Sequence, residues 1–142
     1  MDKAMPARAL LAGALLVALC HPGDAGAVPK KSYINTFTLV MDCSKRAMTW
    51  TEKHKDDTRL AEAAAAMARA NVKTVQDLSP PPEFVDIHPH FVAIVESTLN
   101  ALQAVADGDL QTYYKIKTRM KKERQSLNHV MSEQNFVFPE II

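Results

Sequence analysis

The sequence predicts an all-α protein: an up-down-up-down four-helix bundle that follows a cleaved signal peptide. The 142-residue chain is 47% hydrophobic, and Gly108 is its only glycine after Gly26. From Val28 to Ile142 it is rich in alanine, leucine, methionine, lysine and glutamate, which are good helix formers. Apolar residues recur there at spacings of three and four, the signature of helices that bury one face. The length of this part, 28–142, fits a single domain.

The first segment, Met1–Ala27, has the pattern of a secretory signal peptide. Lys3 and Arg8 give it a positive start, Ala9–Leu19 is apolar, and Ala25-Gly26-Ala27 is an A-x-A cleavage site. The apolar stretch is too short to cross a bilayer. We therefore expect cleavage after Ala27 and a periplasmic or secreted protein with no transmembrane span.

The two cysteines leave alternatives open. Leu16–Cys20 ends in cysteine, so a lipid anchor at Cys20 is an alternative to cleavage after Ala27, although lipidation normally follows a residue smaller than Leu19. Once the signal peptide is removed, Cys43 is the remaining thiol and cannot form an internal disulfide. It is then either a buried small hydrophobic residue or a site of dimerisation.

The first two helices are expected at about 32–54 and about 58–78. The apolar stripe of the first consists of Ile34, Phe37, Met41, Ser44 and Met48, and that of the second of Leu60, Ala64, Met67, Asn71, Val75 and Leu78. The polar segment Lys53–Asp57 separates them, and Asp57 can cap a helix that starts at Thr58. This break is the weakest, so the two helices could instead run together. Pro80-Pro81-Pro82 ends the second helix because proline has no N–H to donate.

The last two helices are expected at about 83–106 and about 110–134, as an antiparallel hairpin. Their stripes consist of Phe84, Ile87, Phe91, Ile94, Thr98, Leu102 and Val105, and of Tyr113, Ile116, Met120, Leu127 and Met131. Pro82 suits the first turn of the third helix. Pro89 should either kink that helix or split off its first turn. Gly108 can close the helix in the left-handed conformation, and Asp109 can cap the next one.

Composition and motifs argue against several classes of function. With 17 basic and 16 acidic residues, the chain has no excess charge for binding nucleic acid. The sequence contains no G-x-S-x-G, H-E-x-x-H, phosphate-binding glycine loop, C-x-x-C or C-x-x-C-H motif. We therefore expect a protein that is not an enzyme and that needs no cofactor.

Histidines and carboxylates form the one candidate metal site. In an antiparallel hairpin turning at Gly108, His88, His90 and His129 lie at the same end of the bundle. Glu83, Asp86 and Glu133 are near them in the sequence, and such groups bind zinc or copper. The helical phase places His129 outward and lets at most one of His88 and His90 point inward. The alternative is that His88 packs under the proline turn and the others are solvated.

The segments Pro80–His88, with the pattern P-P-P-E-F-x-x-x-H, and Ala106–Leu110, with A-x-G-D-L, carry a resemblance to exported bacterial helical-bundle proteins of unknown function. That resemblance implies a fold and a compartment but no activity. The stretch from Pro82 to His129 also resembles the soluble periplasmic cytochrome b562 family, which binds haem b in an exported four-helix bundle. Carried over, Met41 would be the methionine ligand and His129 the histidine ligand; otherwise Met41 is core packing.

Two further segments are candidate interaction surfaces. Cations crowd one stretch of the last helix: Lys115, Lys117, Arg119, Lys121, Lys122 and Arg124. They form either a solvated face or a contact for an acidic partner or anionic lipid headgroups. The tail, 135–142, is apolar, and Pro139 prevents the helix from continuing through it. Its large residues are Phe136, Phe138, Ile141 and Ile142, together with Val137.

The tail either folds back as a lid over the end of the bundle or docks into a partner or a second copy of the protein. The sequence as a whole predicts an exported, non-catalytic bundle that acts by binding or by protein interaction. Its partner would be an unknown protein or another copy of itself. The alternative is a cytochrome b562-like, haem-binding electron carrier.

Overall fold

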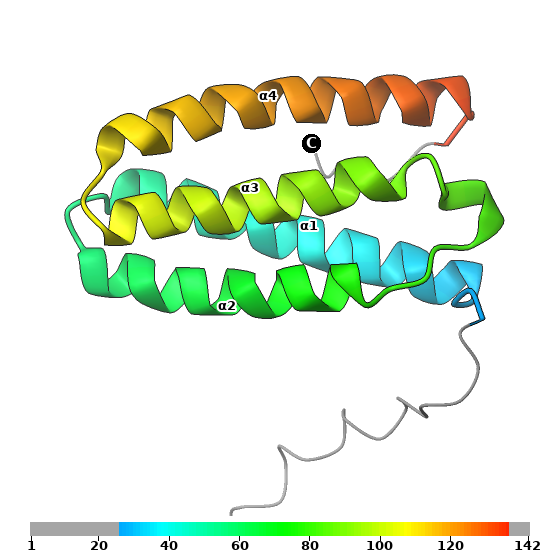
Figure 1. The fold of residues 1–142 in the computed structure, drawn as a ribbon, viewed down its shortest axis with the longest axis horizontal. Coiled ribbons are helices and arrows are strands. Elements are labelled where there is room, and N and C mark those ends of the chain that lie inside the picture. Colours follow the sequence, from blue (N-terminus) through cyan, green and yellow to red (C-terminus); the bar gives the residue numbers. More distant parts are fainter. Residues whose placement is uncertain (1–25, 137–142) are drawn as a thin grey trace, which may run out of the picture.

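The computed structural model describes residues 26–136, and this part of the chain is four long helices, one short 3-10 helix and no strand (Figure 1). The elements are α1 (Lys30–Lys53), α2 (Thr58–Gln76), η1 (Pro82–Phe84), α3 (His88–Ala106) and α4 (Leu110–Glu133). Successive helices run in opposite directions, which confirms the predicted all-α four-helix arrangement. Cys20 and most of the expected signal peptide lie outside the described residues, as do Phe138, Ile141 and Ile142 of the tail.

The predicted helix boundaries at two loops are confirmed. The Asp57 carboxylate accepts a hydrogen bond from the Leu60 amide at 3.0 Å and caps α2, so α1 and α2 do not run together. Asp109 caps α4 in the same way, accepting from the Thr112 amide at 2.9 Å. Gly108 has a φ of 74°, in the left-handed region where a side chain would be strained. These loops fold α1 onto α2 and α3 onto α4 as antiparallel hairpins.

The expected start of the third helix, near residue 83, was wrong. Pro82 begins the 3-10 helix η1, and α3 starts only at His88, with Pro89 in its first turn. Inside a longer helix, the Pro89 ring would clash with the carbonyl of Val85, and its missing N–H would leave a gap in the hydrogen bonding. In the first turn proline costs nothing, because the N–H groups there have no partner within the helix. Of the two effects expected of Pro89, splitting off a turn is the one observed.

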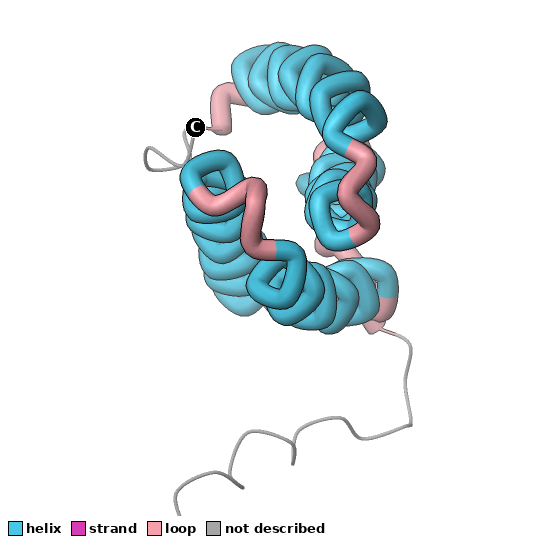
Figure 2. Tube along the Cα trace, turned by 90° about the vertical axis from the view of Figure 1, so that its left-hand side faces the viewer, coloured by secondary structure: helices cyan, strands magenta, loops and turns pink. Residues whose placement is uncertain are grey.

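Helix α3 is the central element of the bundle. It packs along α2 on one side and α4 on the other, and makes a smaller contact with α1, which lies behind it in Figure 1. Figure 2 looks along the helices from the end that carries the α1–α2 and α3–α4 loops and shows the helices grouped around a common axis. We call this the loop end and the opposite one the η1 end. None of the described helices is both long enough and apolar enough to cross a membrane.

The core has two parts that differ in composition. The part at the η1 end is built from large side chains: Tyr33, Phe37, Val40, Met41, Val75, Phe84, Ile87, Phe91, Ile94, Val95, Leu127 and Met131. The part at the loop end contains many alanines: Met48, Ala61, Ala65, Ala68, Ala101, Leu102, Ala104, Val105, Tyr113 and Met120. Alanines on facing helices allow α2 and α3 to approach closely.

A candidate binding groove between α1 and α2

A groove of about 400 Å³ lies between α1 and α2. Its α1 wall consists of Cys43, Ser44, Arg46, Ala47 and Trp50, and its α2 wall of Leu60, Ala63, Ala64, Met67, Ala68 and Asn71. Thr98 of α3 adds the third side. The groove is lined mainly by apolar side chains, and its volume falls within the range of about 300–1,000 Å³ found for small-molecule sites.

The groove follows from the residues that face it. Cys43, Ala47 and Trp50 are spaced by four and three residues and therefore share one side of α1. Small residues on the α2 wall, Ala63, Ala64 and Ala68 among them, do not reach far enough to fill the space. Close packing of α2 on α3 is thus achieved with alanines that leave α1 at a distance.

Besides Arg46 at the rim, three polar side chains line this mainly apolar groove. Ser44 is 4% exposed as a residue, and its hydroxyl is not among the described side-chain atoms that are buried without a partner, which are Thr51 Oγ1 and Gln134 Oε1. Thr98 is 1% exposed and donates from its hydroxyl to the Ile94 carbonyl at 2.9 Å, which leaves its oxygen able to accept a bond. Asn71 is half-buried. A serine hydroxyl can both donate and accept, so Ser44 brings a hydrogen-bonding group to a ligand in the groove.

An aromatic residue and an ion pair mark the rim of the groove. Trp50, the only tryptophan of the chain, stacks on His54 with ring centroids 4.7 Å apart. His54 Nδ1 in turn donates to the Trp50 carbonyl at 2.9 Å. Arg46 Nε lies 2.8 Å from an Asp42 carboxylate oxygen in an exposed pair. Cys43 is half-buried beside these groups and forms no disulfide with a described residue.

The histidines predicted to bind a metal are spread over the η1 end. His88 is half-buried, and its Nδ1 is hydrogen-bonded to the Tyr33 hydroxyl at 3.1 Å. His90 Nδ1 lies 3.9 Å from a Glu123 oxygen, and His129 Nε2 lies 3.4 Å from a Glu133 oxygen. Across residues 26–136, no three His, Cys, Asp or Glu side chains are grouped so that they could hold a metal ion. The zinc or copper site stays a prediction.

Burial shifts the pKa values of Tyr33 and His88 in opposite directions. Tyr33 is fully buried, and this burial raises the pKa of its hydroxyl. Partial burial lowers the pKa of His88 from its usual value and so favours the neutral imidazole, whose Nδ1 shares a hydrogen bond with the Tyr33 hydroxyl. In this arrangement the His88 ring packs beside Tyr33 and Phe91 near η1.

The two residues suggested as haem ligands lie in different environments. Met41 is 4% exposed, within the core part at the η1 end. The side chain of His129 is 74% exposed and faces Glu133 on the outside of α4, as the helical phase predicted. A buried methionine and an outward histidine do not fit the two axial positions of one haem in this arrangement. The haem alternative stays a prediction without support from their placement.

Of the predicted partner-binding residues, only Phe136 lies within the described part of the chain. It is half-buried and packs on Phe84 with ring centroids 4.8 Å apart. The Lys30 ammonium lies 5.3 Å from the centre of the same ring. A tail that folds back as a lid over the η1 end of the bundle would make a contact of this kind.

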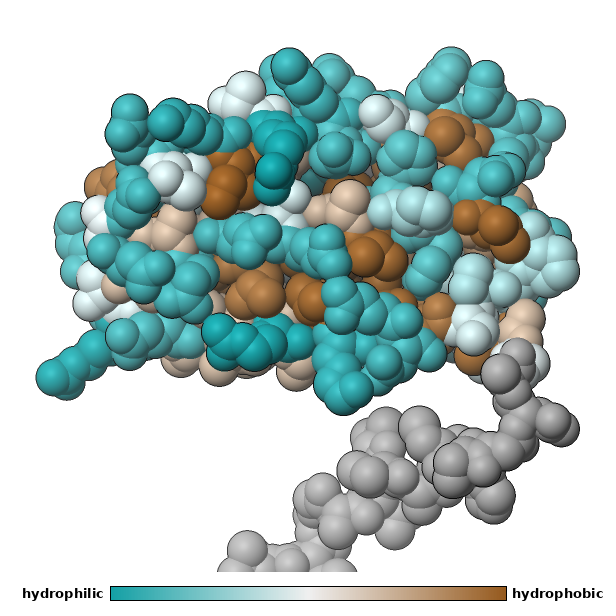
Figure 3. Space-filling model, viewed as in Figure 1, coloured by the Kyte–Doolittle hydropathy of each residue, from teal (hydrophilic) through white to brown (hydrophobic). Residues whose placement is uncertain are grey.

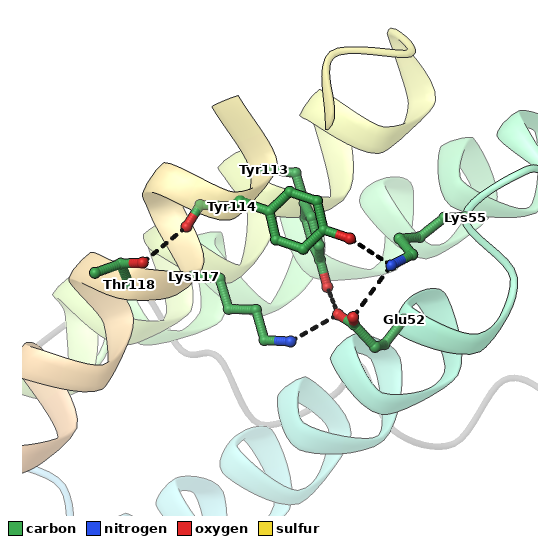
Figure 4. Close-up of polar contacts among 6 residues, drawn as sticks. All are labelled: Glu52, Lys55, Tyr113, Tyr114, Lys117 and Thr118. Carbon is green, nitrogen blue, oxygen red and sulfur yellow. Dashed lines mark hydrogen bonds and ion pairs between the residues drawn. The ribbon is translucent and has the colours of Figure 1, made fainter. Parts of the chain in front are cut away.

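A polar network that the sequence did not predict joins α1 to α4 near the loop end (Figure 4). Its centre is the Glu52 carboxylate, which accepts hydrogen bonds from the Tyr113 hydroxyl, from Lys117 at 2.8 Å and from Lys55 at 3.2 Å. Lys55 also donates to the Tyr114 hydroxyl at 2.5 Å. We call these five residues the Glu52 network.

The hydrogen bonds at Glu52 stabilise its charged form. The bond from Lys117, and next the bond from Tyr113, lower the pKa of Glu52 to about 2. Burial, and then the hydrogen bond to Glu52, raises the pKa of Tyr113. Glu52 and Tyr113 are 61 residues apart in sequence, so their pairing could be found only once the helices were placed. The network is a link between two helices whose backbones come close at few points.

Comparisons with known proteins place this chain in no family. No family model, no curated protein and no solved structure matches it. The groove was also missed at the level of sequence, although a signal was present. Cys43, Ala47 and Trp50 form an apolar stripe beside the buried face of α1, and such a second stripe indicates a surface that is used or covered.

Proposed function

We propose that this protein is an exported, non-catalytic binding protein, and that its α1–α2 groove takes up a small, mostly apolar molecule with one hydrogen-bonding group. The observation that carries this proposal is the mainly apolar groove of about 400 Å³, whose lining includes the hydroxyl-bearing side chain of Ser44, a residue that is 4% exposed. Export is supported by the signal-peptide pattern of Met1–Ala27 alone.

The apolar walls supply the driving force for binding. Water in a groove lined by alanine, leucine, methionine and tryptophan gains few hydrogen bonds, so an apolar ligand displaces it at little cost. Sites of this kind occur between the helices of bundles, with a few polar groups that fix the orientation of the ligand. The groove has both components.

The polar groups also give the ligand a direction. Trp50 and Leu60 flank the α1–α2 loop, whereas Ser44 and Asn71 lie farther from it along their helices. We therefore expect the apolar body of the ligand near Trp50 and Leu60, and its hydroxyl, amide or carbonyl group near Ser44. A molecule without such a group would make no hydrogen bond with the Ser44 hydroxyl.

A variant in which a large side chain fills the groove tests whether the groove is the binding site. Equilibrium dialysis of 2-naphthol should give saturable binding to the natural protein, and Ala64→Phe should abolish it because the new ring occupies the groove. Ala66→Phe, an exposed position on α2 outside the groove, is the matched control and should bind normally. Equal binding to both variants would contradict the proposal, as would the absence of saturable binding to the natural protein.

Removing the Ser44 hydroxyl tests the chemistry of recognition. Ser44→Ala should weaken 2-naphthol binding by about 2- to 10-fold, the net value of one hydrogen bond. It should leave 2-methylnaphthalene, which has a methyl group in place of the hydroxyl, unaffected. If Ser44→Ala changes the affinity for both molecules equally, Ser44 does not select the ligand.

A further inference from the structure

We propose that the outer face of α4 attaches this protein to anionic membrane surfaces. This inference concerns a different surface from the groove and does not depend on it. Six of the ten residues from 115 to 124 are basic, and Glu123 is the only acidic one among them. The chain as a whole has a formal net charge of +1, so this concentration of charge is a local feature of α4.

The lysines at the centre of this face form no close polar side-chain contact with another described residue, although the charge of Lys115 interacts at longer range with the Asp109 carboxylate. Lys115, Lys121 and Lys122 are exposed and form no ion pair or side-chain hydrogen bond with another residue in the described part of the chain. By contrast, Lys117 is bound to Glu52, and Arg119 donates to the Ser97 hydroxyl at 3.4 Å. Three long cationic side chains are therefore available to a partner without breaking any contact of the fold.

The helical phase groups these lysines with a tyrosine on one face. The core positions of α4 are Tyr113, Met120, Leu127 and Met131. At about 100° per residue, the opposite face is made by Tyr114, Lys115, Thr118, Lys121, Lys122 and Gln125. Between Tyr114 and Gln125 it contains no acidic residue, because Glu123 is half-buried and lies within 3.9 Å of His90 of α3. Glu133 lies on the same side about two turns farther along α4, where it is paired with His129.

The position of α4 makes this face accessible over its length. Helix α4 packs chiefly on α3 and forms the outer edge of the bundle, along the top of Figure 1. In the same view, Figure 3 shows that edge covered mostly by hydrophilic residues. A convex, cationic helix of this kind can lie flat against a planar anionic surface and bring several lysines to it at once.

Tyr114 favours a membrane over nucleic acid or an acidic protein. It is 46% exposed on the same face, and its ring contacts the Lys55 ammonium, which lies 5.0 Å from the ring centre. Tyrosine is enriched where membrane headgroups meet the hydrocarbon, because its ring is apolar and its hydroxyl is polar. Lysine side chains beside it can reach the phosphates with their charges while their stems stay near the apolar layer.

Sedimentation with lipid vesicles tests the proposal. Natural protein should bind phosphatidylcholine vesicles that contain phosphatidylglycerol, not pure phosphatidylcholine, and added salt should release it. Because a lysine near an anionic surface contributes about a factor of five in binding, the triple variant K115Q/K121Q/K122Q should bind about a hundredfold more weakly. A second triple variant, K31Q/K45Q/R59Q, removes the same charge from exposed positions of α1 and α2 and should bind nearly as the natural protein does.

Three results would overturn the proposal. One is the absence of binding to the anionic vesicles, and another is an equal loss in the two triple variants, which would indicate attraction by net charge alone. The third concerns Tyr114→Ser, which should weaken vesicle binding but not binding to heparin, a soluble polyanion. If Tyr114→Ser has no effect on vesicles, or if heparin is bound and vesicles are not, the face recognises an acidic polymer instead of a membrane.

Discussion

The η1 end of the bundle is filled by aromatic rings, whereas the loop end is filled largely by alanine. At the η1 end, Tyr33 stacks on Phe84 with centroids 4.7 Å apart, and Phe37 lies 4.5 Å from Phe91. At the loop end, the core includes Ala61, Ala65, Ala68, Ala101 and Ala104. Rings fill the space between four helices, whereas alanines bring α2 and α3 together and leave room on the side of α1.

This difference explains how α1 is held at each end. At the η1 end, apolar contacts from Tyr33, Phe37, Val40 and Met41 bind α1 to the rest of the core. At the loop end, the Glu52 network joins α1 to α4 through polar side chains. The groove opens between α1 and α2 along the alanine-rich part. The comparison therefore predicts that the two ends respond differently to mutation and to pH.

The largest effect should come from removing a ring at the η1 end. Phe91 is fully buried and packs on Phe37. Phe91→Ala should lower the free energy of unfolding by about 3–5 kcal/mol, as for other large-to-small changes in cores. Urea denaturation measures this loss. A loss below about 1 kcal/mol would show that the ring cluster does not hold this end together.

Replacing a small side chain by a large one should lower stability in the η1-end core but not in the groove. Val95 is 1% exposed in the η1-end core, so Val95→Phe should overpack it and cost about 1–3 kcal/mol. Ala64→Phe adds a ring to the groove, where space exists, and should change the unfolding free energy by less than about 0.5 kcal/mol or stabilise slightly. Comparable losses in both variants would mean that the groove is not open space.

The contact made by the tail should have an intermediate effect. Phe136 is half-buried against Phe84, so Phe136→Ala should cost about 1–2 kcal/mol, less than a fully buried ring. For a domain of this size, the melting temperature should fall by several degrees. An unchanged melting temperature would argue against the lid and leave partner binding as the reason for the apolar tail.

A smaller loss than that of any ring should come from the Glu52 network, and it should depend on pH. The pKa of Glu52 is lowered in the folded protein to about 2, from an ordinary value of 4.5. Its contribution is therefore complete above about pH 4.5 and is lost as the pH falls towards about 2. Glu52→Gln should cost about 1 kcal/mol at pH 7, in keeping with partly exposed ion pairs, and less as the pH falls.

A matched control isolates this effect. Glu62 is exposed on α2 and forms no ion pair within the described residues, so Glu62→Gln should follow the natural protein throughout the acid range. If the two variants lose stability in parallel below pH 4.5, Glu52 is not the carboxylate whose protonation loosens α1 from α4. Unfolding free energies measured by urea denaturation at several pH values provide the comparison.

The sequence was sufficient to predict the four helices and their order along the chain. Asp57, Asp109 and Gly108 marked boundaries that depend on local backbone geometry, and the proline turn separated the two hairpins. The third helix started later than expected because the sequence left two outcomes open for Pro89. Capping residues, glycine and proline determine locally where a helix begins and ends, and they can be identified in the sequence alone.

The groove and the Glu52 network depend instead on the distance between helices. Ala64 and Ala47 read as ordinary helix formers until the packing of α2 on α3 determines how far α1 stands away. Glu52 and Lys117 come together only through the placement of α1 beside α4. Such distances result from the whole set of side-chain volumes, which periodicity does not reveal.

The most direct test of the account is to locate a bound ligand in the protein itself. Two-dimensional NMR of nitrogen-labelled protein titrated with 2-naphthol should shift the backbone amides of Ser44, Ala47, Ala64 and Met67 most, because these residues line the groove. The amides of Phe91 and Ile94, in the ring-filled core, should stay in place. Shifts concentrated at the η1 end, or spread evenly over the bundle, would contradict a binding site between α1 and α2.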